Sequence, residues 1–257
     1  MDIILVGSGN TATVIGRKSL SAGHRILQVY SRKYAHADDL ARRLGARSVS
    51  SIPFIERNAD IMIVAMRDDA INSFTQALGQ TKSLIAHTAG ALSINEVRGF
   101  NESYGVIYPL QSLRKDIEII PPLTILVDGN NIVTREKLKE FAKTIAENTL
   151  EADDHMRLKY HLAGTLVNNF TNYLFSLAAT FCEKENISFA VLQPLMEETV
   201  MRLRNISPEA TQTGPALRND LITLQNHRLL IKKYPEILKF YDLFTEEIQK
   251  SDLKFKA

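Results

Sequence analysis

The amino-acid sequence predicts an α/β protein in which a mostly parallel sheet, covered by helices, is followed by an all-α domain. In the first half of the chain, short apolar runs alternate with helical patterns, which is typical of parallel sheets. From about Asp153 onward, apolar residues recur at every third or fourth position, as they do along helices. We therefore expect two domains, at residues 1–152 and 153–257.

The apolar runs of the first half define the expected strands. Some of them are apolar at consecutive positions, which predicts strands buried on both faces. A helix is expected at Thr134–Asn148, and Thr149–Ala152 is a candidate for a last short strand. The strands expected before it are Ile3–Val6, Ile26–Tyr30, Arg47–Val49, Ile61–Ala65, Leu84–His87, Gly105–Tyr108 and Leu123–Val127.

The second half predicts helices only. One long buried helix is expected from six apolar residues that share a face, namely Leu162, Leu166, Phe170, Tyr173, Leu177 and Phe181. Further helices are expected at Ala190–Arg204, Pro215–Lys233 and Pro235–Lys250, joined by an irregular connection at 205–214. These apolar helices exceed what one wall of a cleft requires, so we also expect a homodimer.

The charge balance and the cysteine count narrow the possible partners and locations. With 31 Lys and Arg against 29 Asp and Glu, the net charge of +2 favours neither nucleic acid nor an anionic membrane as a partner. The single Cys182 lies in an apolar stretch and predicts a buried thiol in a reducing compartment. Neither a signal peptide nor a membrane span is recognised. We expect a cytoplasmic protein.

A glycine-rich turn follows the first expected strand. The pattern Gly7-x-Gly9-x-x-Ala12 comes directly after a strand and opens a helix, which is the context of the Rossmann dinucleotide-binding fingerprint. Gly7 permits the tight turn, Gly9 lets backbone N–H groups approach a pyrophosphate, and Ala12 with Gly16 allows close helix–sheet packing. The residues expected to line this phosphate site are Gly7, Ser8, Gly9, Asn10 and Thr11.

The end of the second strand indicates which dinucleotide binds. An NAD-binding fold usually has Asp or Glu there, whereas this chain has Ser31, Arg32 and Lys33. A hydroxyl and a planar guanidinium suit a 2′-phosphate, so we predict NADP as the cofactor. The nicotinamide half is expected beside the loops after the fourth and fifth strands, at Ala65, Met66 and Thr88.

Hydride transfer to a carbonyl or an imine also needs a proton donor. His161, Asn168 and Asn169 fall on one side of the expected long helix, so His161 and Asn169 are candidates to face the cleft. His87 competes with His161 for the acid role, because it ends the fifth strand near the expected nicotinamide, and Lys159 is a third candidate for the proton donor. Each histidine has an equally ordinary structural interpretation.

Arg218 and Asp220 are further candidates. They are expected in the first turns of the helix opened by Gly214 and Pro215, where an anionic group of a substrate, such as a carboxylate, could bind. A structural ion pair or a helix cap explains them equally well. The one cysteine and six dispersed histidines predict no metal site.

Several segments along the chain match one family: 7–12, Ser31-Arg32, 87–91, 109–112, 168–170 and 213–220. In these segments the chain resembles Rossmann-like NADP oxidoreductases that carry a C-terminal helical domain of unknown function. More distantly, it resembles pyrroline-5-carboxylate reductase and deazaflavin-dependent NADP oxidoreductases. Two residues depart from the pattern: Tyr108 stands where histidine is expected, and Asn219 where glycine is expected. The first departure changes any proton-transfer role at that position.

The resemblance implies an NADP-dependent oxidoreductase and does not name a substrate. We therefore predict a reductase that moves a hydride between NADP(H) and a small carbonyl or imine compound. One alternative is a sensor or regulatory protein that binds NADP without turnover. Another is a flavin or deazaflavin as the redox partner.

Overall fold

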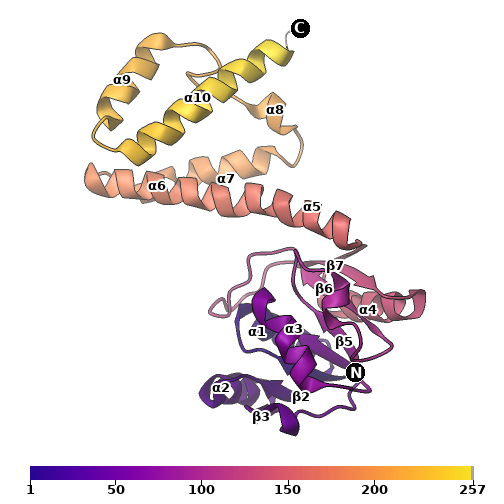
Figure 1. The fold of residues 1–257 in the computed structure, drawn as a ribbon. Helices are drawn as coiled ribbons and strands as arrows, with labels where there is room; N and C mark the ends of the chain where they lie inside the picture. The colour runs from indigo at the N-terminus through magenta and orange to yellow at the C-terminus, as the bar shows by residue number, and fades with distance from the viewer. Residues whose placement is uncertain (256–257) are drawn as a thin grey trace. The chain divides into compact units, whose positions relative to one another are not determined.

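The computed structural model describes residues 1–255 and contains one eight-stranded sheet (Figure 1). The strands are β1 (Asp2–Val6), β2 (Arg25–Tyr30), β3 (Arg47–Val49), β4 (Ile61–Val64), β5 (Leu84–His87), β6 (Tyr104–Pro109), β7 (Thr124–Gly129) and β8 (Asn148–Glu151). Their order is β3-β2-β1-β4-β5-β6-β7-β8. Strands β1 to β6 run parallel, whereas β7 is antiparallel to β6 and parallel to β8. The predicted mostly parallel sheet is confirmed.

Apolar residues cover both faces of this sheet, because consecutive side chains of a strand point to opposite sides. Ile3 and Leu5 pack in one layer with α1 (Asn10–Ser21), α2 (Tyr34–Leu44) and α4 (Ile132–Ile145). Ile4 and Val6 pack in the other layer, which includes residues of α3 (Asp68–Leu78). All four side chains are fully buried. The run of apolar residues along β1 therefore reflects a strand that is buried on two faces.

Helix α4 ends three residues before the predicted end. Residues from Asn148 onward pair with β7, where Asn148 stands opposite Thr124. Pairing at the sheet edge overrides the helical pattern of the sequence.

The chain forms two compact units, residues 1–170 and 171–257. The first unit ends with α5 (Asp154–Gly164) and a π-helical turn at Thr165–Phe170. The second contains α6 (Thr171–Lys184), α7 (Gln193–Arg202), α8 (Pro208–Thr211), α9 (Leu221–Ile231) and α10 (Pro235–Phe255). Among residues 1–255, no helix has both the length and the apolar content to cross a membrane. The domain boundary expected after residue 152 stays a prediction.

The expected long buried helix is partly wrong. It is split into α5, the π turn and α6, and much of its apolar face is exposed in the single chain. Leu162 is 60% exposed and Phe170 is 57% exposed, whereas Cys182 is buried as predicted. Apolar residues at helical spacing define a face, and they do not say what covers it.

The helix predicted from Pro215 begins later, at Leu221. Asn219 adopts a left-handed conformation with φ +51°, which interrupts a helix at that point. The side chain of Asp220 then accepts a hydrogen bond from the Thr223 backbone N–H at 3.1 Å and caps α9. The placement of Arg218 and Asp220 inside the first helical turns was therefore wrong.

Candidate functional site

The turn between β1 and α1 is shaped by its glycines. Gly7 has φ +121°, and a Cβ on it would overlap the carbonyl oxygen of Ala65 on the neighbouring β4 side. A Cβ on Gly16 would come within 2.6 Å of Leu44 and 2.8 Å of Leu5. Gly9 stands at the N-cap of α1, and a Cβ there would meet nothing within 4 Å. The turn therefore packs tightly beneath and is open above, where helix N–H groups favour an anion.

A groove of about 430 Å³ lies over this turn. Ten of the eleven residues predicted to bind the cofactor line it: Gly7, Ser8, Gly9, Asn10, Thr11, Ser31, Arg32, Ala65, Met66 and Thr88. Lys33 does not line it and instead stands at the N-cap of α2. The sequence pattern thus identified four separate segments that meet at one edge of the sheet.

The groove contains a second guanidinium, which the sequence analysis missed. Arg67 lines it, as Arg32 does, and forms a two-point ion pair with Asp69, at 2.7 and 3.1 Å. Its signal was its place directly after Ala65 and Met66, at the carboxyl end of β4. Two guanidinium groups in one groove favour a polyanionic ligand.

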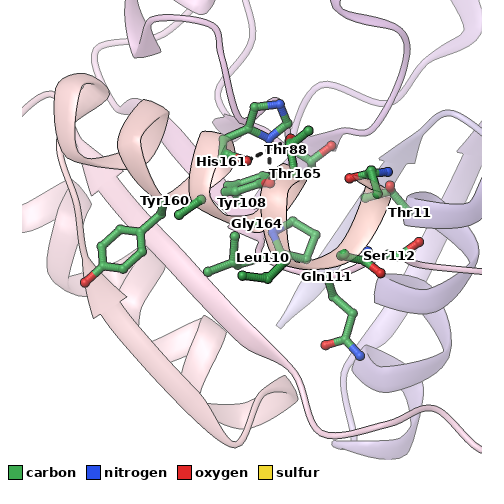
Figure 2. A pocket seen from close by; sticks show the side chains of 15 residues that line it. Thr11, Thr88, Tyr108, Leu110, Gln111, Ser112, Tyr160, His161, Gly164 and Thr165 are labelled. Atoms are coloured by element: carbon green, nitrogen blue, oxygen red, sulfur yellow. Dashed lines mark hydrogen bonds between the residues drawn. The ribbon is translucent and has the colours of Figure 1, made fainter. Parts of the chain in front are cut away.

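A larger cavity, of about 810 Å³, adjoins the groove (Figure 2). Thr11 and Thr88 line both spaces, so the groove continues into the cavity at these two side chains. The other lining residues are Tyr108, Pro109, Leu110, Gln111, Ser112, Tyr160, His161, Ala163, Gly164, Thr165, Val167, Asn168 and Asn169. All of them belong to the first compact unit. The lining carries hydroxyls, amides and one imidazole, and none of its residues is Asp, Glu, Lys or Arg.

Tyr108 and His161 form a pair in this cavity. Tyr108 stands at the end of β6 and His161 on α5, and the Tyr108 hydroxyl is 2.8 Å from His161 Nδ1. Their rings meet edge to face at 5.7 Å between centroids. Burial raises the pKa of Tyr108, and Asp68 adds to that rise while Arg157 opposes it. The sequence analysis noted Tyr108 only as a departure from a family pattern.

The π turn places two amides in the same cavity. Asn168 and Asn169 line it with His161, as their spacing predicted. The backbone that carries both asparagines is π-helical over Thr165–Phe170, although a regular helix was expected. Such turns occur often at functional sites. The catalytic role predicted for Asn169 stays a prediction.

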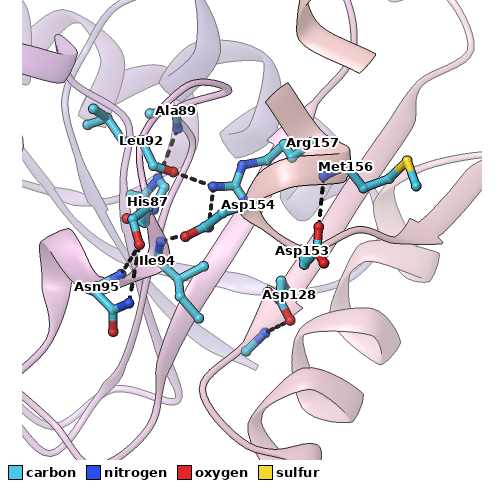
Figure 3. Close-up of polar contacts among 12 residues, drawn as sticks. His87, Ala89, Leu92, Ile94, Asn95, Asp128, Asp153, Asp154, Met156 and Arg157 are labelled. Atoms are coloured by element: carbon cyan, nitrogen blue, oxygen red, sulfur yellow. Dashed lines mark hydrogen bonds and ion pairs between the residues drawn. The ribbon is translucent and has the colours of Figure 1, made fainter. Parts of the chain in front are cut away.

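His87 is part of a buried polar network instead (Figure 3). Its Nδ1 accepts a hydrogen bond from the Ala89 backbone N–H at 3.2 Å, so Nε2 carries the proton and donates to the Ser93 carbonyl at 3.1 Å. Burial lowers the pKa of His87 to about 4, and the nearby Arg157 contributes to that shift. Both nitrogens are occupied and the ring is neutral at pH 7, which argues against the acid role.

Arg157 links this network to the Tyr108–His161 pair. Its fully buried side chain donates to the Leu92 carbonyl and to Asp154 Oδ1, and the same carboxylate accepts from the Ile94 N–H at 3.0 Å. These contacts fix the start of α5 to the loop that follows β5. His161 lies four residues after Arg157, on the same side of the helix.

The remaining candidates, Arg218 and Asp220, are not among the residues that line this cavity. Arg218, which is exposed, and Asp220, the cap of α9, belong to the second compact unit. Within residues 1–255, no cluster of His, Cys, Asp or Glu is arranged to hold a metal ion.

Two family models match parts of the chain. Residues 2–90 match a family described as NADP oxidoreductase, coenzyme F420-dependent. Residues 123–248 match a domain of unknown function, DUF2520. No curated protein matches the sequence.

Solved structures are similar over nearly the whole chain. A protein of Bacteroides fragilis, BF3122, assigned as an NADP oxidoreductase, is 32% identical, with 97% of this chain and 98% of that one covered and a TM-score of 0.91. The 1-pyrroline-5-carboxylate reductase of Streptococcus pyogenes is 13% identical, with coverage of 97% and 98% and a TM-score of 0.66. An imine reductase from Myxococcus stipitatus, solved with NADP⁺, is 15% identical, with coverage of 98% and 94% and a TM-score of 0.65. The last two similarities show a shared fold.

Proposed function

Because the chain belongs to the family of the Bacteroides fragilis NADP oxidoreductase, we propose that it is an NADP-dependent reductase acting on a small carbonyl or imine compound. One observation carries this proposal: the groove over the glycine turn continues, at Thr11 and Thr88, into a cavity with neutral polar groups. A hydride donor held in the groove and an acceptor held in the cavity would meet at that junction.

The residues of the groove fit NADP. The helix N-terminus at Gly9 suits the pyrophosphate, and Ser31 with Arg32 suits a 2′-phosphate at the end of β2. When bound, NADPH supplies a hydride. The chain's own groups hold the substrate, and Asn168, Asn169 and Gln111 offer amide donors and acceptors for it. The neutral lining favours a substrate whose reacting end is uncharged.

We also propose that the chain works as a homodimer built by its helical part. The support is a set of large apolar side chains that are more than half exposed in the single chain, among them Phe170, Ile222 and Leu229. Exposed apolar surface of this kind marks interaction sites. A carboxylate on the substrate, bound near Arg218 and Asp220, and a cytoplasmic location stay predictions.

The direct experiment is NADPH oxidation by the purified protein with a panel of cyclic imines, ketones, keto acids and flavin or deazaflavin analogues. We expect turnover with at least one imine or carbonyl compound and tighter binding of NADP than of NAD. If NADPH binds and no member of the panel accepts a hydride, the reductase proposal fails and the binding role remains. If neither nucleotide binds, the cofactor assignment fails as well.

A further inference from the structure

We propose that Tyr108 donates the proton of the reduction and that His161 positions its hydroxyl. The inference rests on the proposed reductase function and adds a residue that neither the sequence analysis nor the family match assigns. Its basis is the 2.8 Å contact between the Tyr108 hydroxyl and His161 Nδ1 inside the cavity that adjoins the groove.

Position is the first argument. Tyr108 is at the carboxyl end of β6, next to β5, whose following residue Thr88 lines both the groove and the cavity. Ligands of open α/β sheets bind at this edge. The Tyr108 ring is therefore beside the place where the acceptor carbon would meet the hydride.

Packing is the second argument, because Gly90 makes room for the pair. A Cβ on Gly90 would come within 2.7 Å of His161 Nδ1 and 2.9 Å of Tyr108 Cζ. The first atom is a partner in the hydrogen bond, and the second carries the hydroxyl that makes it. The loop after β5 is thus shaped to let the tyrosine and the histidine meet, and any larger residue at position 90 would push them apart.

The charges around Tyr108 favour the phenol as the donor. Burial and Asp68 raise the pKa of Tyr108, so its O–H stays protonated at neutral pH. Arg157 lowers that pKa and so stabilises the phenolate that remains after donation. His87, the other titratable ring of this region, is held neutral by its two hydrogen bonds. The charged or titratable groups that act on Tyr108 are Arg157 and Asp68, through their charges, and His161, through its contact with the hydroxyl.

If NADPH is bound, the C–H bond that holds its hydride would break as a C–H bond forms at the acceptor carbon, so the cofactor is oxidised and the substrate is reduced. The π electrons of the C=O or C=N bond move to the heteroatom. The heteroatom takes the proton from Tyr108 Oη, whose O–H bond breaks and leaves a phenolate. His161 Nδ1–H donates a hydrogen bond to that oxygen, and water returns the proton afterwards.

This arrangement requires the proton of the Tyr108–His161 contact to lie on His161 Nδ1. The phenol hydrogen is then free to point toward the substrate. Nitrogen NMR of the imidazole, in the protein without cofactor, reports which ring nitrogen carries the proton. A bare Nδ1 would mean that the phenol hydrogen is committed to the histidine, and it would overturn the proposal independently of any substrate.

Substitutions test the donor directly. Tyr108→Phe is expected to lower kcat by about 10²-fold to 10⁴-fold, which is the range for loss of a general acid, with NADPH affinity unchanged. The matched control is Tyr104→Phe, which removes a phenol at the other end of β6, outside the residues that line the cavity, and is expected to retain activity. His161→Asn keeps an N–H near the position of Nδ1 and should retain much more activity than His161→Leu.

The pH profile gives a second signature. A donor must be protonated, so activity should hold at neutral pH and fall only as pH rises past about 10, the ordinary value for tyrosine, because burial raises this pKa. That fall should be absent from the residual activity of Tyr108→Phe. The proposal is overturned, while the reductase function stands, if the kcat of Tyr108→Phe stays within threefold of that of the unmodified enzyme. It is also overturned if His161→Asn loses more activity than His161→Leu. If the unmodified protein oxidises NADPH with none of the compounds in the panel, the reductase function itself is overturned.

Discussion

The two compact units differ in how completely they bury their own apolar residues. In residues 1–170, the sheet carries fully buried side chains on both faces, such as Ile3 and Ile4. In residues 171–257, helices display large apolar side chains, such as Ile222 and Leu229, of which about three quarters of the surface is exposed. The sheet of the first unit therefore buries its own apolar residues, whereas the helices of the second unit leave an apolar surface that indicates an interaction site.

The tightest packing of the first unit should tolerate substitution least. Gly7→Ala places a methyl group on the Ala65 carbonyl oxygen at a φ of +121°, so backbone and strand must shift. We expect a loss of about 3 kcal/mol or more in the free energy of unfolding, together with loss of NADPH binding. Urea unfolding and calorimetric titration measure the two effects.

Gly9→Ala is the matched comparison for that change, because a Cβ there meets nothing within 4 Å. It should leave the free energy of unfolding nearly unchanged and weaken only nucleotide binding. Equal destabilisation by both substitutions would contradict the account of the turn as tight beneath and open above.

Acid should destabilise the first unit through His87. Burial lowers its pKa to about 4 in the folded chain, while the unfolded chain titrates near 6.5. The contribution of neutral His87 to the free energy of unfolding is fully present above about pH 6.5, because the imidazole is then neutral in both the folded and the unfolded chain. It is lost as pH falls toward 4, because the unfolded state binds the proton first, and the total loss is about 3 kcal/mol.

Unfolding free energies measured between pH 7 and pH 4 test this, with His87→Gln as the comparison. The variant is expected to be less stable at pH 7 and to lose less stability on acidification. Parallel pH curves for the two proteins would show that His87 is not the group responsible.

Cofactor preference should depend on one exposed side chain of the groove. Arg32→Ala removes the guanidinium at the end of β2 and should weaken NADP binding by about 1.4 kcal/mol, a factor of ten, with little effect on NAD. Calorimetric titration of both nucleotides measures the difference. Lys33→Ala serves as the control, since Lys33 lies outside the groove. If Arg32→Ala leaves the preference intact, Arg67 becomes the candidate for the phosphate contact.

The same contrast explains what sequence reasoning could predict. Strands buried on two faces and a glycine turn leave a local pattern, so the sheet and ten of the residues that line the groove followed from short segments. The Tyr108–His161 pair could not be predicted in this way, because its two members are 53 residues apart. They meet only because the fold brings the end of β6 against α5. His87 seemed equally suited to catalysis until its two hydrogen-bond partners were known.

The smallest expected effect is the dependence of stability on protein concentration. It tests whether another copy of the chain covers the apolar surface of the second unit. If folding is coupled to dimerisation, a tenfold increase in protein concentration adds about 0.7 kcal/mol per chain, half of the 1.4 kcal/mol per dimer, and raises Tm. Leu229→Glu should remove this concentration dependence and yield monomers in sedimentation, because Leu229 is 71% exposed in the single chain and a carboxylate opposes burial there. Ile132→Glu makes the same kind of substitution at a side chain that is 70% exposed on α4 of the first unit, and it should leave the dimer intact. A Tm that is independent of concentration in the unmodified protein, with monomers in sedimentation, would mean that this surface is not a homodimer interface.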